Sequence, residues 1–259
     1  MNRVTKDRHI HSPICPHGSK DSYEMYIEKA IRMGLKAITF TEHLPLPDDF
    51  MNKEIRDFCS PSKHVITEYL TDLKLLQQKY SSKLKINIGF EVDYLEGYED
   101  FTRGLLDKYG CEDGLLSIHF LKINGEFYCL DESPKRFIQL ANMLGGVKEL
   151  YDLYYETMIK SIKADLGNNK PKRIGHPTLV RIFNQEIPFN YTNIALLEKI
   201  MQALKQQGYE IDYNVAGLRK PYCGEVYPSG LFLELVEKYN IPKVYGSDAH
   251  CVDHLGKGY

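Results

Sequence analysis

Side chains that bind divalent metals recur along this sequence, and each lies at or near the end of an apolar run. Imidazole and carboxylate groups together bind zinc, manganese or iron. Three histidines occur within nine positions near the start, and an Asp-x-His pair occurs near the end. This pattern predicts a multinuclear hydrolase site rather than a binding module. The candidate ligands are His9, His11, His17, His43, Glu91, His119, His176, Asp248 and His250.

The spacing of several candidates carries geometric information. His9 and His11 are two residues apart, and alternate side chains of a strand point to the same side, so both imidazoles can face one metal. His17 follows a Ser-Pro-Ile-Cys-Pro segment and can reach a neighbouring metal. Glu91 ends an apolar run, where a carboxylate is costly to bury unless it is paired or bound to metal. Each histidine alone is as well explained by a polar strand end, whereas the whole set is not.

Short apolar runs alternate with longer segments of helical period. We predict strands before His9 and over residues 35–41, 85–92, 114–119, 173–176, 210–215 and 243–246. We predict helices over residues 21–33, 65–80, 98–108, 134–165 with a break at Gly145-Gly146, 193–207 and 229–239. Regular alternation without a repeat or a linker predicts one parallel α/β domain spanning residues 1–259.

The distribution of the candidate ligands distinguishes two parallel architectures. Open doubly wound sheets bind ligands at one switch point, whereas barrels gather side chains from many strand ends onto one face. Here the candidates come from nearly every strand end, which favours an irregular barrel of seven strands. The sequence contains neither a glycine-rich phosphate loop nor a dinucleotide fingerprint.

The amino-acid composition limits the classes of partner that the protein can bind. The chain has 259 residues, a net charge of −2 and no long basic run, so charge-driven binding to nucleic acid or membranes is not indicated. The polar start lacks the apolar core of a secretory signal, and no apolar stretch approaches the roughly 20 residues that span a bilayer. The six cysteines are scattered without a Cys-x-x-Cys pair, which favours a reducing cytoplasm. The oligomeric state is not encoded in any pattern.

Several motifs together resemble those of the polymerase and histidinol phosphatase (PHP) family. They are His-x-His near the start, Thr-Glu-His-Leu-Pro-Leu-Pro at 41–47, Glu91, Ser-x-His at 117–119, Gly-His-Pro at 175–177 and Ser-Asp-Ala-His at 247–250. The segment at 41–47, and Gly-Leu-Arg-Lys followed by Glu-Val-Tyr-Pro at 217–228, are similar to the monofunctional histidinol-phosphate phosphatase branch. Relatives commonly continue into another helix after the last motif, whereas this sequence ends at Tyr259.

The resemblance implies a distorted (β/α)7 barrel with three divalent metal ions, which are zinc, manganese or iron. It implies one metal held by His9, His11, Glu91 and Asp248, a second held by Glu91, His119 and His176, and a third held by His17, His43 and His250. All of these positions match the family's pattern in residue type. The implied activity is hydrolysis of L-histidinol phosphate to L-histidinol and phosphate in histidine biosynthesis.

The expected chemistry is attack of a metal-bridging hydroxide on a phosphate monoester, with the metals neutralising charge in the transition state. Glu91, Asp248 and His250 are the predicted catalytic residues, the last two as sources of a proton for the leaving alkoxide. Basic residues after strands can bind phosphate, and an acidic residue suits the amine of histidinol. The predicted substrate contacts are Arg181, Arg219, Lys220 and Glu225.

Two other functions are compatible with parts of this pattern. A PHP-type phosphoesterase acting on nucleotides or nucleic-acid ends would use the same metals, but the near-neutral charge supplies no basic track for a backbone. A non-catalytic metal-binding barrel is expected to have lost ligands, and none of the expected ligands is missing here. The sequence therefore favours a small-molecule phosphatase.

Overall fold

Seven strands form one parallel sheet in a computed structural model that describes residues 4–258. They are β1 Lys6–Ile10, β2 Ala37–His43, β3 Lys85–Asp93, β4 Leu115–Ser117, β7 Arg173–Ile174, β8 Glu210–Asn214 and β9 Lys243–Gly246, and they neighbour one another in that order. After β9 the chain returns to β1, where Ile10 forms a parallel bridge with Ala249. This contact brings the two edges together, so the sheet is a nearly closed, distorted (β/α)7 barrel, as the sequence predicts.

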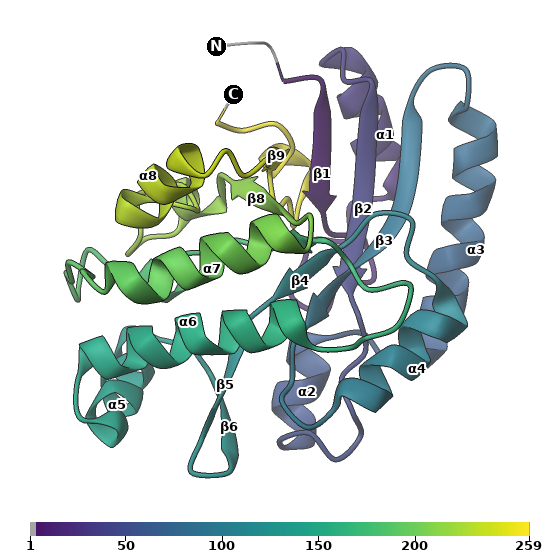
Figure 1. Cartoon of the computed structure of the whole chain (residues 1–259). Coiled ribbons are helices and arrows are strands. Elements are labelled where there is room, and N and C mark those ends of the chain that lie inside the picture. The colour runs from purple at the N-terminus through teal and green to yellow at the C-terminus, as the bar shows by residue number, and fades with distance from the viewer. Residues whose placement is uncertain (1–3, 259) are drawn as a thin grey trace.

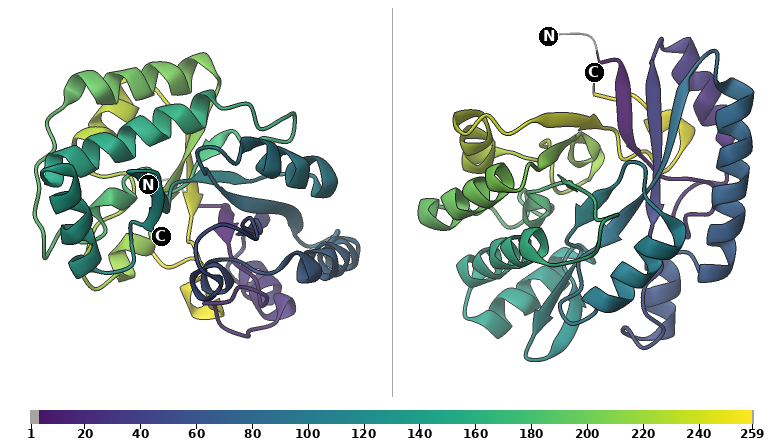
Figure 2. Two further views of the ribbon diagram at one scale, coloured as in Figure 1. Left: turned by 90° about the horizontal axis from the view of Figure 1, so that it is seen from below. Right: turned by 45° about the vertical axis from the view of Figure 1, so that its right-hand side comes forward.

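Helices cover the outside of the sheet (Figures 1 and 2). They are α1 Tyr23–Arg32, α2 Lys53–Cys59, α3 Lys63–Tyr80, α4 Glu99–Tyr109, α5 Pro134–Leu144, α6 Val147–Lys163, α7 Ile194–Gln206 and α8 Gly230–Lys238. Short 3-10 turns lie at η1 Leu179–Arg181, η2 Ala216–Arg219 and η3 Val252–His254. Among residues 4–258, no helix combines the length and the apolar character needed to cross a membrane.

Local sequence explains where these elements begin and end. Ser22 caps α1 by accepting a hydrogen bond from the backbone N–H of Met25, as an N-cap serine does. Gly145 adopts a left-handed conformation and ends α5, which confirms the predicted break between α5 and α6. Every residue of β2 is buried, because helices cover one face of the sheet while the barrel interior covers the other.

Two elements near the carboxyl ends of the strands were not predicted. Strands β5 Phe120–Ile123 and β6 Glu126–Cys129 form an antiparallel hairpin whose turn is Asn124-Gly125, both with positive φ, which is the conformation that an Asn-Gly turn favours. Helix α2 has only seven residues and contains no buried one. Both elements lie beyond the carboxyl ends of β1, β2 and β3 (Figure 1).

A network of charged side chains joins the strands toward their amino ends. Arg173 is only 1% exposed and donates to Asp113 at 2.9 Å and to Glu210 at 3.2 Å. Arg8 makes two hydrogen bonds to Asp113, at 2.8 and 2.7 Å, and Thr39 donates to the same carboxylate at 2.6 Å. Burial raises the pKa of Asp113, but the two guanidinium groups outweigh this and hold its pKa below the usual value. Asp113 therefore ties β1, β2 and β7 together.

We expect Asp113→Asn to lower the free energy of unfolding by at least about 3 kcal/mol at pH 7, because it leaves buried guanidinium groups undercompensated. Since the folded pKa of Asp113 is depressed, its contribution is present above its unfolded pKa, about 4, and is lost as the pH falls through its folded pKa. Urea unfolding measured at several pH values should show the difference from wild type shrinking in acid.

The matched control is Asp100→Asn, because the Asp100 side chain is 94% exposed. Its unfolding midpoint should equal that of wild type. Equal unfolding midpoints for Asp113→Asn and Asp100→Asn at pH 7 would show that the network does not stabilise the barrel.

Candidate metal centre

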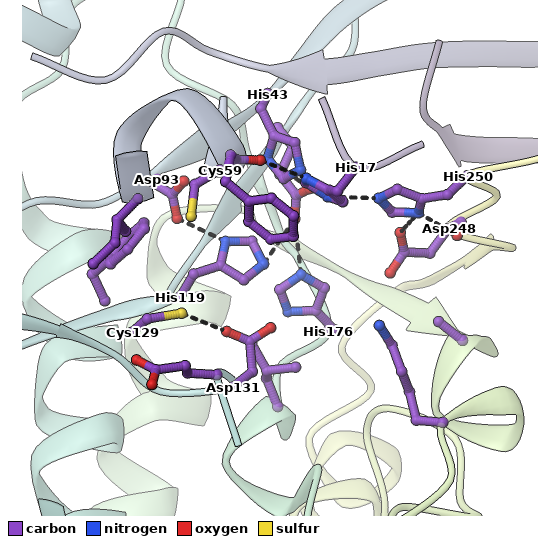
Figure 3. Close-up of a pocket in the computed structure, with 18 of the residues that line it drawn as sticks. His17, His43, Cys59, Asp93, His119, Cys129, Asp131, His176, Asp248 and His250 are labelled. Carbon is purple, nitrogen blue, oxygen red and sulfur yellow. Dashed lines mark hydrogen bonds and ion pairs between the residues drawn. The ribbon is translucent and has the colours of Figure 1, made fainter. Parts of the chain in front are cut away.

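A cavity of about 770 Å³ opens at the carboxyl ends of the strands. Its wall includes histidines and carboxylates from the strand ends, residues of α2, the end of β6 and the turn at η2 (Figure 3). Seven of the nine candidate ligands line it: His17, His43, Glu91, His119, His176, Asp248 and His250. The remaining two, His9 and His11, are fully buried directly beside Glu91 and Asp248.

The first donor group consists of His9, His11, Glu91 and Asp248. The Nε2 atoms of His9 and His11 lie 3.4 and 3.3 Å from Oε2 of Glu91, and 3.6 and 3.4 Å from Oδ1 of Asp248. Two ligand atoms on one tetrahedral zinc are about 3.3 Å apart. Both Nε2 atoms are buried without a hydrogen-bond partner in the described structure. These four side chains therefore fit a divalent metal better than they fit one another.

The second group uses the other oxygen of Glu91. Its Oε1 lies 2.8 Å from Nε2 of His176 and 3.8 Å from Nε2 of His119, and the Ser117 hydroxyl donates to it at 2.7 Å. The donor atoms of Glu91, His119 and His176 all lie within 4.8 Å of one another. One carboxylate thus faces two donor groups, which is the arrangement required for a bridging ligand.

The third group lies between β2 and the loop after β9. Donor atoms of His11, Cys15, His43 and His250 lie within 4.8 Å of one another. His17 completes this region, because its Nε2 is 3.1 Å from Nε2 of His250. Both ring nitrogens of His43 are buried without a hydrogen-bond partner among the described residues, and Nδ1 lies 3.5 Å from Oε2 of Glu91. The resemblance implies His17, His43 and His250 here; the buried thiol of Cys15 lies beside them.

Carboxylates and carbonyls behind the imidazoles fix their orientation. Nδ1 of His9 donates to Asp212 at 2.7 Å, and Nδ1 of His119 donates to Asp93 at 2.8 Å. Nδ1 of His17 donates to the carbonyl of Phe58 in α2 at 2.9 Å. Binding Nδ1 in this way selects the tautomer whose Nε2 is free to bind a metal and makes that nitrogen more basic.

The backbone bends sharply at two of the ligands. His176 and Asp248 have φ values of 24° and 53°, a region that side chains other than glycine rarely adopt. The bend at His176 follows Gly175, where a Cβ would lie 2.1 Å from the Ser117 hydroxyl and 3.5 Å from Oε1 of Glu91. Only glycine leaves room for the Ser117 hydroxyl, which explains the first residue of the Gly-His-Pro motif.

Neighbouring charges shift the pKa values of the side chains in the donor groups. Burial lowers the pKa of His9, but Asp248, Asp212 and Glu91 outweigh burial and raise it to about 10. Burial likewise lowers the pKa of His119, while Asp93 and Glu91 raise it to about 10. Burial raises the pKa of Glu91, and the neighbouring histidines hold it well below its usual value. A cation that binds here displaces protons from histidine, so metal binding weakens as the pH falls.

The predicted substrate contacts separate into two places. Arg219 and Lys220 line the metal cavity, and Arg219 donates to the backbone oxygens of Ser247, at 2.7 Å, and Asp248, at 3.3 Å. Arg181 lines a different cavity, of about 460 Å³, and binds both carboxylate oxygens of Glu225. Arg181 and Glu225 therefore neutralise each other and are not among the residues that line the metal cavity.

Four further side chains near the ligands were not anticipated as functional. Asp93 is two residues after Glu91 on the same strand face, and Asp212 interrupts a strand buried in a parallel sheet; both were visible signals. Cys15 is buried beside the third donor group, and the scattered spacing of the cysteines did not single it out. Asp131 follows the unpredicted hairpin, so nothing in the sequence alone placed it at the site.

A barrel of parallel strands with histidine and carboxylate groups converging at its carboxyl end defines the chain as a (β/α)7-barrel metalloprotein. Residues 7–216 match the PHP domain, and the chain belongs to the PHP family. This confirms the resemblance on which the ligand assignment is based.

Relatives cover nearly the whole chain. The histidinol-phosphatase of Bacillus subtilis strain 168 is 37% identical over 258 residues, covering 98% of this chain and 96% of the relative. A structure from Listeria monocytogenes, provisionally assigned as the histidinol phosphatase HisK, has a TM-score of 0.93 and 38% identity, with 98% of each chain covered. The Lactococcus lactis histidinol phosphate phosphatase, solved with zinc, L-histidinol and phosphate, shares the fold with a TM-score of 0.72 and 19% identity, covering 96% of this chain and 87% of that one.

We expect Asp212→Asn to weaken the first donor group and Asp93→Asn to weaken the second, because each change removes the anion that orients a histidine. The affinity for one metal per chain should fall about 10- to 100-fold in each variant. Metal retained per chain after dialysis against graded chelator concentrations measures this effect. Wild-type retention in both variants, with near-UV circular dichroism unchanged, would contradict the orienting role.

Proposed function

We propose that this chain hydrolyses L-histidinol phosphate to L-histidinol and phosphate, as a metal-dependent phosphatase of histidine biosynthesis in the cytoplasm. The observation that carries the proposal is Glu91, whose two oxygens face two separate groups of metal-binding side chains, in a chain similar over its full length to histidinol-phosphatases. A phosphate monoester needs its charge neutralised and its leaving group oriented, and such a site provides both.

Three divalent ions would occupy the three donor groups. His9, His11, Glu91 and Asp248 would hold one, Glu91, His119 and His176 a second, and His17, His43 and His250 a third. Bound ions of this kind supply hydroxide at neutral pH and neutralise charge on phosphate oxygens. Histidine and carboxylate ligands suit zinc, manganese and iron alike.

The chain's own residues position the ester and handle the proton. Arg219 and Lys220 place positive charge on the η2 side of the cavity, where it attracts a phosphate dianion. The hydrogen bonds from Arg219 to the carbonyls of Ser247 and Asp248 fix η2 relative to the loop that carries two of the ligands. Asp248 and His250 line the cavity, where they could relay a proton from water to the leaving alkoxide rather than supply one of their own.

Acidic residues in the cavity wall argue against nucleic acid as the substrate. Glu54, Asp131 and Glu132 line the same cavity as Arg219 and Lys220. A polyanionic backbone that entered the cavity would meet these carboxylates, whereas nucleic-acid sites present basic tracks. A small substrate with both a negative and a positive end fits such a cavity better.

The direct test is phosphate release from a panel of monoesters by protein whose bound metals have been counted. The proposal predicts that L-histidinol phosphate gives the highest kcat/KM, with two or three metals per chain. Preference for a different ester would retain the metal chemistry and remove the assignment of the substrate. Release from none of the esters by metal-loaded protein would refute the phosphatase function.

Glu91→Gln should disturb two donor groups at once, because a neutral amide replaces both anionic oxygens. We expect the variant to lose at least one metal per chain and nearly all turnover. The control for loss of a cavity carboxylate is Glu132→Gln. Glu132 also lines the cavity, but it accepts a 3.2 Å hydrogen bond from Arg136 and belongs to none of the donor groups. Normal turnover by Glu91→Gln would show that the bridging role is wrong.

A further inference from the structure

The third donor group contains one more side chain than the family pattern assigns to it. Donor atoms of His11, Cys15, His43 and His250 all lie within 4.8 Å of one another. His11 faces the first group through Nε2, which lies 3.3 Å from a carboxylate oxygen of that group. His17 contacts His250, and the Cys15 thiol lies within hydrogen-bond reach of His17. Without His11, the third group therefore consists of three imidazoles and one thiol.

The loop after β1 holds Cys15 in a fixed, fully buried position. Its backbone N–H donates to the carbonyl of Ser12 at 3.0 Å, and its carbonyl accepts from the backbone N–H of Gly18 at 3.3 Å. The Lys20 ammonium donates to the same carbonyl at 3.2 Å. A Cβ at Gly18 would lie 3.1 Å from Cβ of Cys15, so the loop can turn back beside the thiol because this residue is glycine.

The imidazoles beside Cys15 indicate a ligand independently of the thiol. His43 is only 5% exposed, and neither of its ring nitrogens has a hydrogen-bond partner among the described residues. Buried polar atoms of this kind are costly unless a ligand satisfies them. The Nε2 atoms of His17 and His250 are 3.1 Å apart, close to the spacing of about 3.3 Å between two ligands of one tetrahedral zinc. The three histidines meet on one side of the cavity (Figure 3).

A thiol changes which metal the third group prefers. Three imidazoles leave one position of a tetrahedral zinc open, and a fourth protein ligand closes it. Thiolate is a soft ligand that favours zinc, whereas manganese prefers oxygen ligands. The first two donor groups contain only imidazole and carboxylate, so they lack this preference. Among the cysteines of residues 4–258, Cys15 alone belongs to a group of converging donor atoms.

We propose that Cys15 is the fourth ligand of the third metal and that its sulfur makes this site selective for zinc over manganese. The inference rests on the arrangement of three metals in the proposed function. As the metal–sulfur bond forms, the thiol releases its proton to solvent. Four protein ligands leave no open position at the third ion, so the activation of water falls to the two groups that share Glu91.

The test replaces the metals of the whole protein with cobalt(II). A cobalt–sulfur bond gives a charge-transfer band in the near ultraviolet, which bonds to nitrogen and oxygen do not give. Wild type should bind three cobalt ions per chain and show this band. Cys15→Ser should lose the band and bind the third ion at least about tenfold more weakly. The matched controls are Cys59→Ser and Cys129→Ser, which line the same cavity outside the donor groups and should keep the band.

Competition between metals tests the selectivity. Zinc-loaded protein is dialysed against graded concentrations of manganese, and the zinc that remains per chain is counted. One zinc ion per chain of wild type should resist concentrations that displace the others, and Cys15→Ser should lose this resistant ion. Equal displacement of all zinc from wild type and from Cys15→Ser would refute the selectivity.

Other outcomes overturn the inference. Three cobalt ions in wild type without the charge-transfer band would do so, and this result does not depend on a variant folding. A band that survives in Cys15→Ser and disappears in either control would do so as well. Phosphate release from L-histidinol phosphate, measured in parallel, separates the two failures. Normal release without the band overturns the ligand alone, whereas a band that depends on Cys15 without release supports the ligand and refutes the proposed function.

Discussion

The dehydration of Glu91 and Asp248 among imidazoles is the constraint on which this structure depends. A carboxylate taken out of water must be compensated by positive charge or by several hydrogen bonds. Here the compensation comes from histidines whose Nε2 atoms point at the carboxylates without bonding well to them. Protons or divalent cations supply the rest of the positive charge that the two carboxylates require. Because parallel strands all end at one edge, a barrel is the architecture that brings so many of these groups to one place.

The two ends of the barrel differ in how their buried charges are compensated. Toward the amino ends, Arg8 and Arg173 both bind Asp113, so that opposite charges compensate one another there. At the carboxyl ends, donor atoms remain unpartnered and the backbone is bent at His176 and Asp248, which costs stability. The separation explains why substitutions at Asp113 and at Glu91 are expected to affect different properties.

The sequence was sufficient for the barrel and for the candidate ligands at its carboxyl edge, whereas their grouping into metal sites came from the family resemblance. Apolar runs separated by helical segments identify all seven strands of the barrel, and a polar residue at the end of such a run can only face the carboxyl edge. His43 and Glu91 were predictable in this way. The division of the ligands among three metals stays a prediction, supported by the distances around Glu91. Helix α2 was not predicted, because its seven residues are fewer than the window over which a helical period is recognised in a sequence.

The positions of side chains on the connecting segments could not be predicted from the sequence, because they depend on tertiary packing. Arg181 and Glu225 both follow strands, yet they bind each other away from the metal cavity, while Lys220 faces into it. Asp131 reaches the cavity only because the Asn124-Gly125 turn folds a hairpin back onto the mouth of the barrel. Ligand residues on strand ends can therefore fix the chemistry of a barrel, whereas the segments between strands decide which molecule reaches that chemistry. Carboxylates and basic residues line one cavity here, which favours a small substrate that carries both signs over a polyanion.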